Sequence, residues 1–500
     1  MDSLYYTILV SKSWEQYHED WIAKPPVKDQ LLIPRPALTD TASNGRTLTD
    51  LPKEIILQIG SFLDTAELSN TSLVCRHLQI VQECLFWDLL QPQLMRSGIG
   101  FLLRTVIERP ELRLRTKRLF HMLPPLDKLI PKDDQLAVLK RAFADATNGL
   151  PRKYAWIGGL PIQTDDEPMN QHTLALLLLA TCPNLQDWCL CSFIDVQSSL
   201  VVFVQEAPVN HSFDQLKTMA FRWSAHPDGI MYDQSFTMKL VESVLRLPRL
   251  EQFLLESMGR GLGGAPHAIT TGCSNVSRLE LMGPGVEDVL VLIISACRAL
   301  TKLHCVSVRI DETKILAIEA HKGTLTHVSL VDDEWTCGAA VVGRFASFPC
   351  LESITASETS LWHNLPRLSD LDLINIPQNP IRLAQSVPLT VRFMCIYALD
   401  NERPDVVPQL EELIKSKAVP VLKRICIMHL ILKPGGEPAT NLLFSRAEMF
   451  EWVVDRKAEY GTLEALCKAQ NIQLLHRDLF VVKDPNRRAR EIAAVRHHIS

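Results

Sequence analysis

The chain has 500 residues and 47% of them are hydrophobic, so it is long enough for several domains or for one long array of repeats. Its 52 basic and 57 acidic residues give a formal net charge of −5, which excludes the strong basic excess of many nucleic-acid-binding chains. The longest apolar runs are shorter than the ~20 residues that a membrane span needs, and the start lacks the basic residues of a signal peptide. We therefore expect a soluble protein of the cytoplasm or the nucleus, with no membrane partner.

The N-terminal part of the chain predicts an extension followed by a short helix. Residues 1–46 are expected to form a partly ordered extension. Pro52 marks a helix start, because the fixed φ and the missing N–H of proline suit a first turn. Ile55, Ile59 and Leu63 then recur at helical spacing. They predict one apolar stripe on this helix.

Two more short helices are predicted within residues 47–92. Asp64 and Glu67 have the spacing of a capping box, in which two side chains satisfy N–H groups of the first turn. A third apolar series begins at Leu78 and ends near Trp87. Three short helices of this size bury too little surface for a core of their own, so the block is expected to dock on another surface.

This block resembles an F-box, the motif that docks on the Skp-family adaptor of cullin–RING ubiquitin ligases. The Leu-Pro-x-Glu-Ile start at Leu51, the Val-Cys-Arg at Val74 and the late Trp87 occur in the order and at the spacing of that family. Two departures are Leu78, where the family often has tryptophan, and Gly60, which weakens the first helix by ~1 kcal/mol relative to alanine. The resemblance implies apolar side chains that enter a hydrophobic groove of the adaptor. The adaptor-binding residues that it implies are Leu51, Pro52, Glu54, Ile55, Ile59, Leu63, Leu68, Val74, Cys75 and Trp87.

Residues 93–165 have a mixed pattern and are expected to link or cap the neighbouring domains. The segment 109–120 within them is basic with interleaved apolar residues, but it is a single cluster with few aromatic residues. It favours a solvated face of a helix or strand over a nucleic-acid-binding surface. We therefore expect no nucleic-acid partner.

From Cys182 onward the spacing L-x-x-L-x-L, with other apolar residues in place of some leucines, returns ten times. The first residues of successive segments lie 17–34 residues apart, and the middle of the array fits the ~20–29-residue period of leucine-rich repeats. Each segment predicts a strand. The segments are Leu185-Trp188-Leu190, Leu216-Met219-Phe221, Leu250-Phe253-Leu255, Val276-Leu279-Leu281, Leu300-Leu303-Cys305, Leu325-Val328-Leu330, Leu351-Ile354-Ala356, Leu368-Leu371-Leu373, Val391-Met394-Ile396 and Leu422-Ile425-Ile427.

Helical patterns lie between several of these strands. They occupy residues 233–247, 285–300 and 311–323. Repeated strand–helix units predict a parallel sheet on the inner side of a curved solenoid, because each unit buries its apolar face only against its neighbours. The pattern resembles the irregular leucine-rich repeats common behind fungal F-boxes. The expected fold is therefore α/β, with a short three-helix F-box at 47–92 followed by an irregular leucine-rich-repeat solenoid at 166–480.

The two ends of such an array need caps. The F-box side is expected to cover one end, and a helix predicted at 446–460 is expected to cover the other. Residues 481–500 are rich in arginine and predict a basic, solvated C-terminal tail.

Side chains between the apolar anchors are expected to point into the concave face, where a target would bind. They carry charges of both signs, which suits a folded protein surface. These candidate target-binding residues are Asp187, Arg222, Glu256, Arg278, Glu280, Lys302, His304, His327, Asp370, Asp372 and Arg424.

Two patterns indicate other chemistry but lack the partners that the chemistry needs. Gly259–Gly264 spells G-x-G-x-x-G after a predicted strand, yet the residues from Pro266 onward do not predict the helix N-terminus that holds a pyrophosphate. Cys189 and Cys191 lack a second pair at zinc-like spacing. We expect no cofactor, no metal and no catalytic residue.

The resemblance implies a non-enzymatic substrate receptor of an SCF-type cullin–RING ubiquitin ligase. Its F-box would join the Skp-family adaptor and the cullin, and its repeats would bind an unknown target protein. Two alternatives remain open: a repeat scaffold whose F-box-like helices only cap the solenoid, and a nucleotide-dependent enzyme that uses Gly259–Gly264. A scaffold predicts that the apolar stripe of residues 52–63 is buried against the repeats, whereas a receptor predicts that part of it is exposed.

Overall fold

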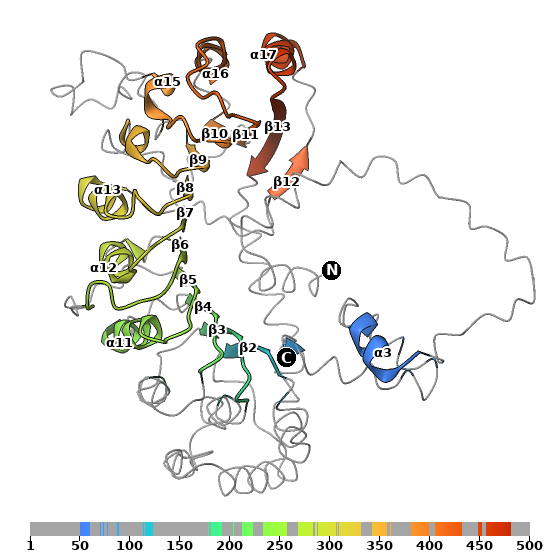
Figure 1. The fold of residues 1–500 in the computed structure, drawn as a ribbon, viewed down its shortest axis with the longest axis vertical. Helices are drawn as coiled ribbons and strands as arrows, with labels where there is room; N and C mark the ends of the chain where they lie inside the picture. Colours follow the sequence, from blue (N-terminus) through green and yellow to red (C-terminus); the bar gives the residue numbers. More distant parts are fainter. Residues whose placement is uncertain are drawn as a thin grey trace, which may run out of the picture. The chain divides into compact units, whose positions relative to one another are not determined.

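The computed structural model (Figure 1) describes the part of the chain in which the repeats lie, together with one helix of the N-terminal region. The described residues are 51–60, 71, 74, 78, 88–89, 114, 116–123, 179, 182–192, 204, 213–223, 234–257, 269–283, 286–287, 289–306, 308, 310–331, 343–357, 361, 382–399, 406–432, 449–452 and 457–481. The chain folds as two compact units. Unit 1 holds residues 1–191 and 206–216, and unit 2 holds residues 192–205 and 217–500.

Unit 1 contains helix α3 and short parallel strands. The elements are α3 (Lys53–Gly60), β1 (Asp88–Leu89), β2 (Arg118–Leu123) and β3 (Asp187–Ser192). β1 pairs with β2 in parallel, and the backbone N–H groups of Gln186 and Asp187 donate to the Lys117 carbonyl. Trp188 of β3 stacks on Phe213, with 5.5 Å between the ring centroids. Both side chains are buried, so they form an aromatic centre for this unit.

Unit 2 is built on a mainly parallel sheet whose strands follow one another in chain order from β4 to β11. The strands are β4 (Thr218–Trp223), β5 (Gln252–Ser257), β6 (Arg278–Met282), β7 (Lys302–Val306), β8 (His327–Val331), β9 (Ser353–Ser357), β10 (Phe393–Leu399), β11 (Arg424–Leu432), β12 (Met449–Trp452) and β13 (Gln473–Val481). From β4 to β11 each strand pairs in parallel with the next, and β13 pairs in parallel with β11. β12 ends the order and pairs antiparallel with β13.

Helices connect the strands and lie along one side of this sheet (Figure 1). They are α11 (Gln234–Leu245), α12 (Leu290–Ala296), α13 (Glu312–Glu319), the 3-10 helix η6 (Arg344–Ser347), α15 (Leu383–Ser386), α16 (Val406–Lys415) and α17 (Lys457–Ala469). The first three lie within the predicted segments 233–247, 285–300 and 311–323, so those predictions are confirmed. Among the described residues, no helix is long and apolar enough to cross a membrane.

The L-x-x-L-x-L segments account for the core. In the nine segments that the structure describes, every residue at the first, fourth and sixth position is at most 7% exposed. Positions 4 and 6 lie on a strand and share one face of it, because side chains alternate along an extended chain. The predicted α/β architecture with a parallel sheet is therefore confirmed for this part of the chain.

Hydrogen bonds tie each repeat to the one before it. The backbone N–H groups at positions 2 and 3 of a segment both donate to the position-2 carbonyl of the previous segment, as Thr301 and Lys302 do to Ser277 at 2.8 and 3.0 Å. The hydroxyls of Thr301 and Thr326 repeat the same step, at 2.9 and 3.0 Å, to the carbonyls of Ser277 and Thr301. This hydroxyl ladder occupies position 2 of β7 and β8 and fixes the register of neighbouring units.

One sequence prediction for unit 2 is wrong, and another, the strand at 368–373, lies outside the described residues. β9 pairs directly with β10 in the register Ser353↔Phe393. Residues 446–460 do not form one helix, because Met449–Trp452 is strand β12. The sheet therefore ends in an antiparallel strand, and helix α17 begins only at Lys457.

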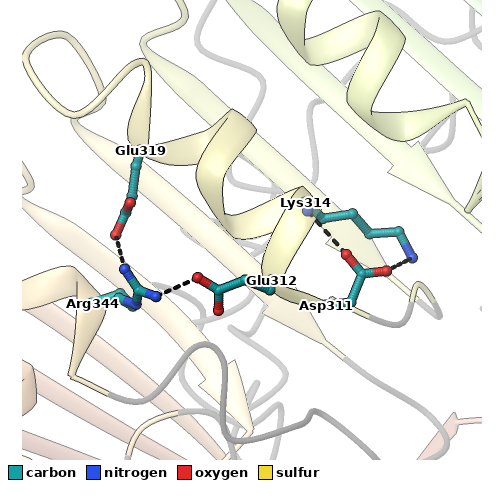
Figure 2. Close-up of polar contacts among 5 residues, drawn as sticks. All are labelled: Asp311, Glu312, Lys314, Glu319 and Arg344. Carbon is teal, nitrogen blue, oxygen red and sulfur yellow. Dashed lines mark hydrogen bonds and ion pairs between the residues drawn. The ribbon is translucent and has the colours of Figure 1, made fainter.

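Charged side chains on the helical side link successive repeats (Figure 2). Arg344 of η6 forms ion pairs with Glu312 and Glu319 of α13. At the start of α13, Asp311 accepts from the Lys314 N–H at 3.0 Å and pairs with the Lys314 ammonium at 3.2 Å. These pairs are partly exposed, so they position the helices more than they stabilise them.

Candidate adaptor-binding helix and inner face of the sheet

Helix α3 presents an apolar pair to solvent. Its start is fixed by the Pro52 carbonyl, which accepts from the N–H groups of Ile55 and Ile56 at 3.0 and 3.1 Å. Ile55 is 41% exposed and Ile59 is half-buried, whereas Ile56 is only 2% exposed. Ile55 and Ile59 are four residues apart and therefore lie on the same side of the helix. Ile56 anchors the helix, and the pair beside it stays accessible.

Other residues of the F-box-like block add to this surface. Leu51 is half-buried and Pro52 is exposed, and both immediately precede the helix. Val74 is helical and 73% exposed, while Leu78 is buried. Glu54 lies on α3. The remaining predicted adaptor-binding residues, Leu63, Leu68, Cys75 and Trp87, lie outside the described residues, as do the predicted capping residues Asp64 and Glu67.

The choice between a receptor and a scaffold depends on whether the repeats cover this stripe. Ile55 leaves two fifths of its surface open, and the neighbouring Pro52 is also exposed. Because α3 and the repeats belong to separate units, both alternatives stay predictions for a binding experiment.

The inner face of the sheet carries side chains at positions 3 and 5 of each segment. Position 3 is open to different degrees: Arg278 is exposed, while Lys302 and His327 are half-buried. In the sheet register Arg278 lies opposite Lys302, and Lys302 lies opposite His327. Three adjacent strands thus align three basic side chains in one row, an alignment that the sequence spacing only implied.

Position 5 is buried along the same strands. Glu280 and His304 are 6% and 4% exposed, and Gln252 donates to the Glu280 carboxylate at 3.0 Å. These two predicted target-binding residues therefore offer little surface to a partner. At position 5 of β10 and β11, Cys395 and Cys426 are buried side by side. Burial raises the pKa of the Cys395 thiol, and the neighbouring Cys426 thiol adds to this increase.

The other predicted target-binding residues have mixed outcomes. Asp187 and Glu256 are half-buried. Arg424 is half-buried, and its Nε donates to Gln473 at 2.8 Å. Arg222 lies on β4. Asp370 and Asp372 lie outside the described residues.

Sequence spacing missed several exposed basic residues at position 2. Arg392 and Lys423 are exposed at the N-terminal ends of β10 and β11. They follow Val391 and Leu422, the first residues of their segments, so the L-x-x-L-x-L pattern places them. Only the strand order, however, shows that they are neighbours of the row at position 3.

The two patterns for other chemistry lie only partly within the described residues. Within these residues, no group of three or more His, Cys, Asp or Glu side chains could hold a metal ion. Cys189 is buried on β3, where a thiol packs as a small apolar group. Gly259–Gly264 lies outside the described residues.

The comparisons with known proteins assign the N-terminal block alone. Residues 48–88 match the F-box-like family, a span that includes α3, Val74 and Leu78. No curated protein matches the chain. The chain therefore carries an F-box-like domain, and F-box domains generally bind Skp-type adaptors. The parallel strand–helix repeats of unit 2 come in addition to that domain.

Proposed function

We propose that this chain is a substrate-recognition subunit of an SCF-type cullin–RING ubiquitin ligase. Its F-box-like domain docks on the Skp-family adaptor, which joins it to the cullin. Its strand–helix units, which we take as irregular leucine-rich repeats of the type found behind fungal F-boxes, bind a target protein in the cytoplasm or nucleus. The observation that carries this proposal is the accessible Ile55–Ile59 pair within the span that matches the F-box-like family.

The physics of docking is helix-in-groove recognition. Ile55 and Ile59 are separated by about one helical turn, the spacing with which an amphipathic helix places apolar anchors in a partner's groove. Leu51 and Pro52 extend the apolar surface beyond the first turn. Ile56, the residue after Ile55, is buried, so docking would use the neighbouring side chains that are already accessible.

The proposed mechanism is proximity, and the chain supplies no acid, base or nucleophile. A receptor that holds a target beside a charged ubiquitin-conjugating enzyme raises the effective concentration of the target's lysines. The chemistry of transfer belongs to that enzyme. No cofactor or metal is required of this chain.

Co-purification with a Skp-family adaptor tests the proposal. The full chain should retain the adaptor, and the variant Leu51→Ala/Pro52→Ala/Ile55→Ala should lose it. Circular dichroism must show that the variant keeps the helix and sheet content of the wild type. If the wild type also fails to retain the adaptor, the F-box-like block is a structural cap and the chain is a repeat scaffold without a ligase role.

A further inference from the structure

The N-terminal ends of β6–β11 carry a strong bias of charge. Positions 2 and 3 of the six segments that contain these strands comprise twelve residues, of which five are Lys or Arg, one is His327 and one, Glu352, is acidic. The whole chain has a net charge of −5, so the excess of basic residues is local to these strand ends and does not follow from the overall composition. The six basic residues, which we call the basic edge, are Arg278, Lys302, His327, Arg392, Lys423 and Arg424.

The sheet register aligns four residues of the basic edge, Arg278, Lys302, His327 and Arg424, in one row, and Arg392 and Lys423 lie one residue before that row. Arg278, Lys302 and His327 lie opposite one another on β6, β7 and β8. β9 and β10 continue the row with Ser353 and Phe393, and Phe393 lies opposite Arg424 on β11. Strands in a sheet are ~4.8 Å apart, so the five steps from β6 to β11 span roughly 24 Å. An extended peptide of about seven residues covers that length.

Several of these cations are accessible. Arg278, Arg392 and Lys423 are exposed, and the other three are half-buried. Arg424 uses its Nε for Gln473, which leaves the remaining guanidinium donors for a ligand. Two acidic residues on these strands lie outside the row at position 3. Glu352 is at position 2 of the segment that contains β9, and Glu280 is buried at position 5 of the segment that contains β6.

Short side chains at position 2 leave the row at position 3 open to a ligand. On β6, β7 and β8 the position-2 side chains are Ser277, Thr301 and Thr326, whose hydroxyls donate to carbonyls of the preceding repeat. These short side chains stay close to the backbone, so they leave the longer basic side chains at position 3 as the most prominent groups there. The half-buried Phe393 adds an apolar contact in this row.

We propose that the basic edge binds an acidic segment of the target protein, an extended stretch of about seven residues rich in Asp and Glu. The segment would cross the strands at their N-terminal ends, with its carboxylates beside the basic edge. Charge complementarity supplies this preference, since cations on rigid neighbouring strands favour carboxylates spaced along an extended chain. The inference rests on the proposed function only in naming the segment as part of the target.

Fluorescence anisotropy with labelled peptides tests the inference on the full chain. The probes are an eight-residue glutamate peptide, an eight-residue glutamine peptide and a single-stranded oligothymidylate of similar charge. The variant is Arg392→Glu/Lys423→Glu. The matched control is Lys322→Glu/Lys468→Glu, which makes the same change of charge at two exposed lysines outside the basic edge.

The glutamate peptide should bind more tightly than the glutamine peptide, and added salt should weaken the binding. The basic-edge variant should bind it about tenfold more weakly, and the control variant should bind like the wild type. Equal binding of the two peptides, or equal losses in both variants, would overturn the inference. Tighter binding of the oligothymidylate that depends on Arg392 and Lys423 would also overturn it, because the partner would then be a nucleic acid.

Adaptor co-purification with the same variants separates the two proposals. Both charge variants should retain the adaptor, because neither changes the F-box-like domain. Loss of peptide binding with the adaptor retained concerns the basic edge alone, and a wild type that binds the peptide but not the adaptor refutes the proposed function alone.

Discussion

His321 joins two repeats of unit 2, and its removal should cost the fold a measurable free energy. The imidazole is 7% exposed. Its Nδ1 accepts from the Leu300 N–H at 3.4 Å, and its Nε2 lies 3.1 Å from the Ile294 carbonyl. This geometry fits a neutral ring with the proton on Nε2. The side chain therefore connects the end of α12, the start of β7 and the turn after α13.

The cost of His321→Ala follows from what each partner loses. The Ile294 carbonyl also accepts from the Cys297 N–H at 3.1 Å, so it keeps a donor and its loss is ~1 kcal/mol. The Leu300 N–H, in a residue that is 0% exposed, loses an acceptor, and an unsatisfied buried donor costs ~1–3 kcal/mol. Because the 3.4 Å bond is long, the lower half of that range applies. We expect a total of ~2–3 kcal/mol.

Urea unfolding followed by circular dichroism measures this loss, with hydrogen exchange of residues 290–331 to locate it. His321→Asn is the matched control, since its amide oxygen can take the place of Nδ1 and keep the Leu300 bond. It should cost only ~1 kcal/mol. If His321→Asn is as destabilising as His321→Ala, the Leu300 bond is not the reason for the loss. A loss below ~0.5 kcal/mol for His321→Ala would refute the role of His321 in joining the two repeats.

Three further predictions concern a helix cap, a strained backbone and the thiols. Burial acts to raise the pKa of Asp311, but the hydrogen bonds from Thr313 and Lys314, with the Lys314 charge, together outweigh it and hold the pKa below its usual value. The stabilising effect of Asp311 is therefore complete above the unfolded pKa and is lost as the pH falls through the folded pKa. Asp311→Ala should therefore lower the free energy of unfolding by ~1 kcal/mol at pH 7, and Asp311→Asn should keep the cap while removing its pH dependence, as urea unfolding between pH 2 and 7 would measure. Lys417 has a φ of 51° after α16, so Lys417→Gly should raise the free energy of unfolding by ~0.5–1 kcal/mol. In the same assay Lys415→Gly, at the last residue of the helix, should lower it by a similar amount, because it adds backbone freedom and removes the ion pair with Glu411. Burial, with the neighbouring Cys273 thiol, raises the pKa of Cys297 to about 12, so a thiol reagent at pH 8 should label the exposed Cys350 quickly and Cys297 only after unfolding, as mass spectrometry of the labelled peptides would show.

The strands of unit 2 were predictable because burial dictates their composition. Positions 4 and 6 of a segment share one buried face, so an apolar pair at that spacing is required wherever a unit packs on its neighbours. β13 escaped prediction because the residues aligned with Leu422 and Ile427 are Asn471 and His476. Asn471 has a φ of 57° just after α17, a conformation that asparagine tolerates well. The backbone therefore favours asparagine at this position, where other segments have an apolar residue.

Other features depend on contacts that a linear pattern does not contain. The segment at 446–460 has helical periodicity, but Phe450 and Trp452 of β12 pair with Phe480 and Asp478 of β13. Pairing with a distant strand therefore decides their structure. Spacing likewise could not separate Ile55 from Ile56, because either one can face the rest of the unit. The basic edge joins residues as distant as Arg278 and Lys423, and it exists only once the register is known.

Isothermal titration of the full chain with a purified Skp-family adaptor tests the central claim most directly. Two single variants make it decisive: Ile55→Asp in the exposed stripe of α3, and Leu316→Asp at a 51% exposed leucine of α13 in unit 2. A receptor predicts that the wild type and Leu316→Asp bind equally, and that Ile55→Asp weakens binding at least about tenfold, because a carboxylate would enter an apolar groove. No binding by the wild type, or equal affinity for Ile55→Asp, would contradict it.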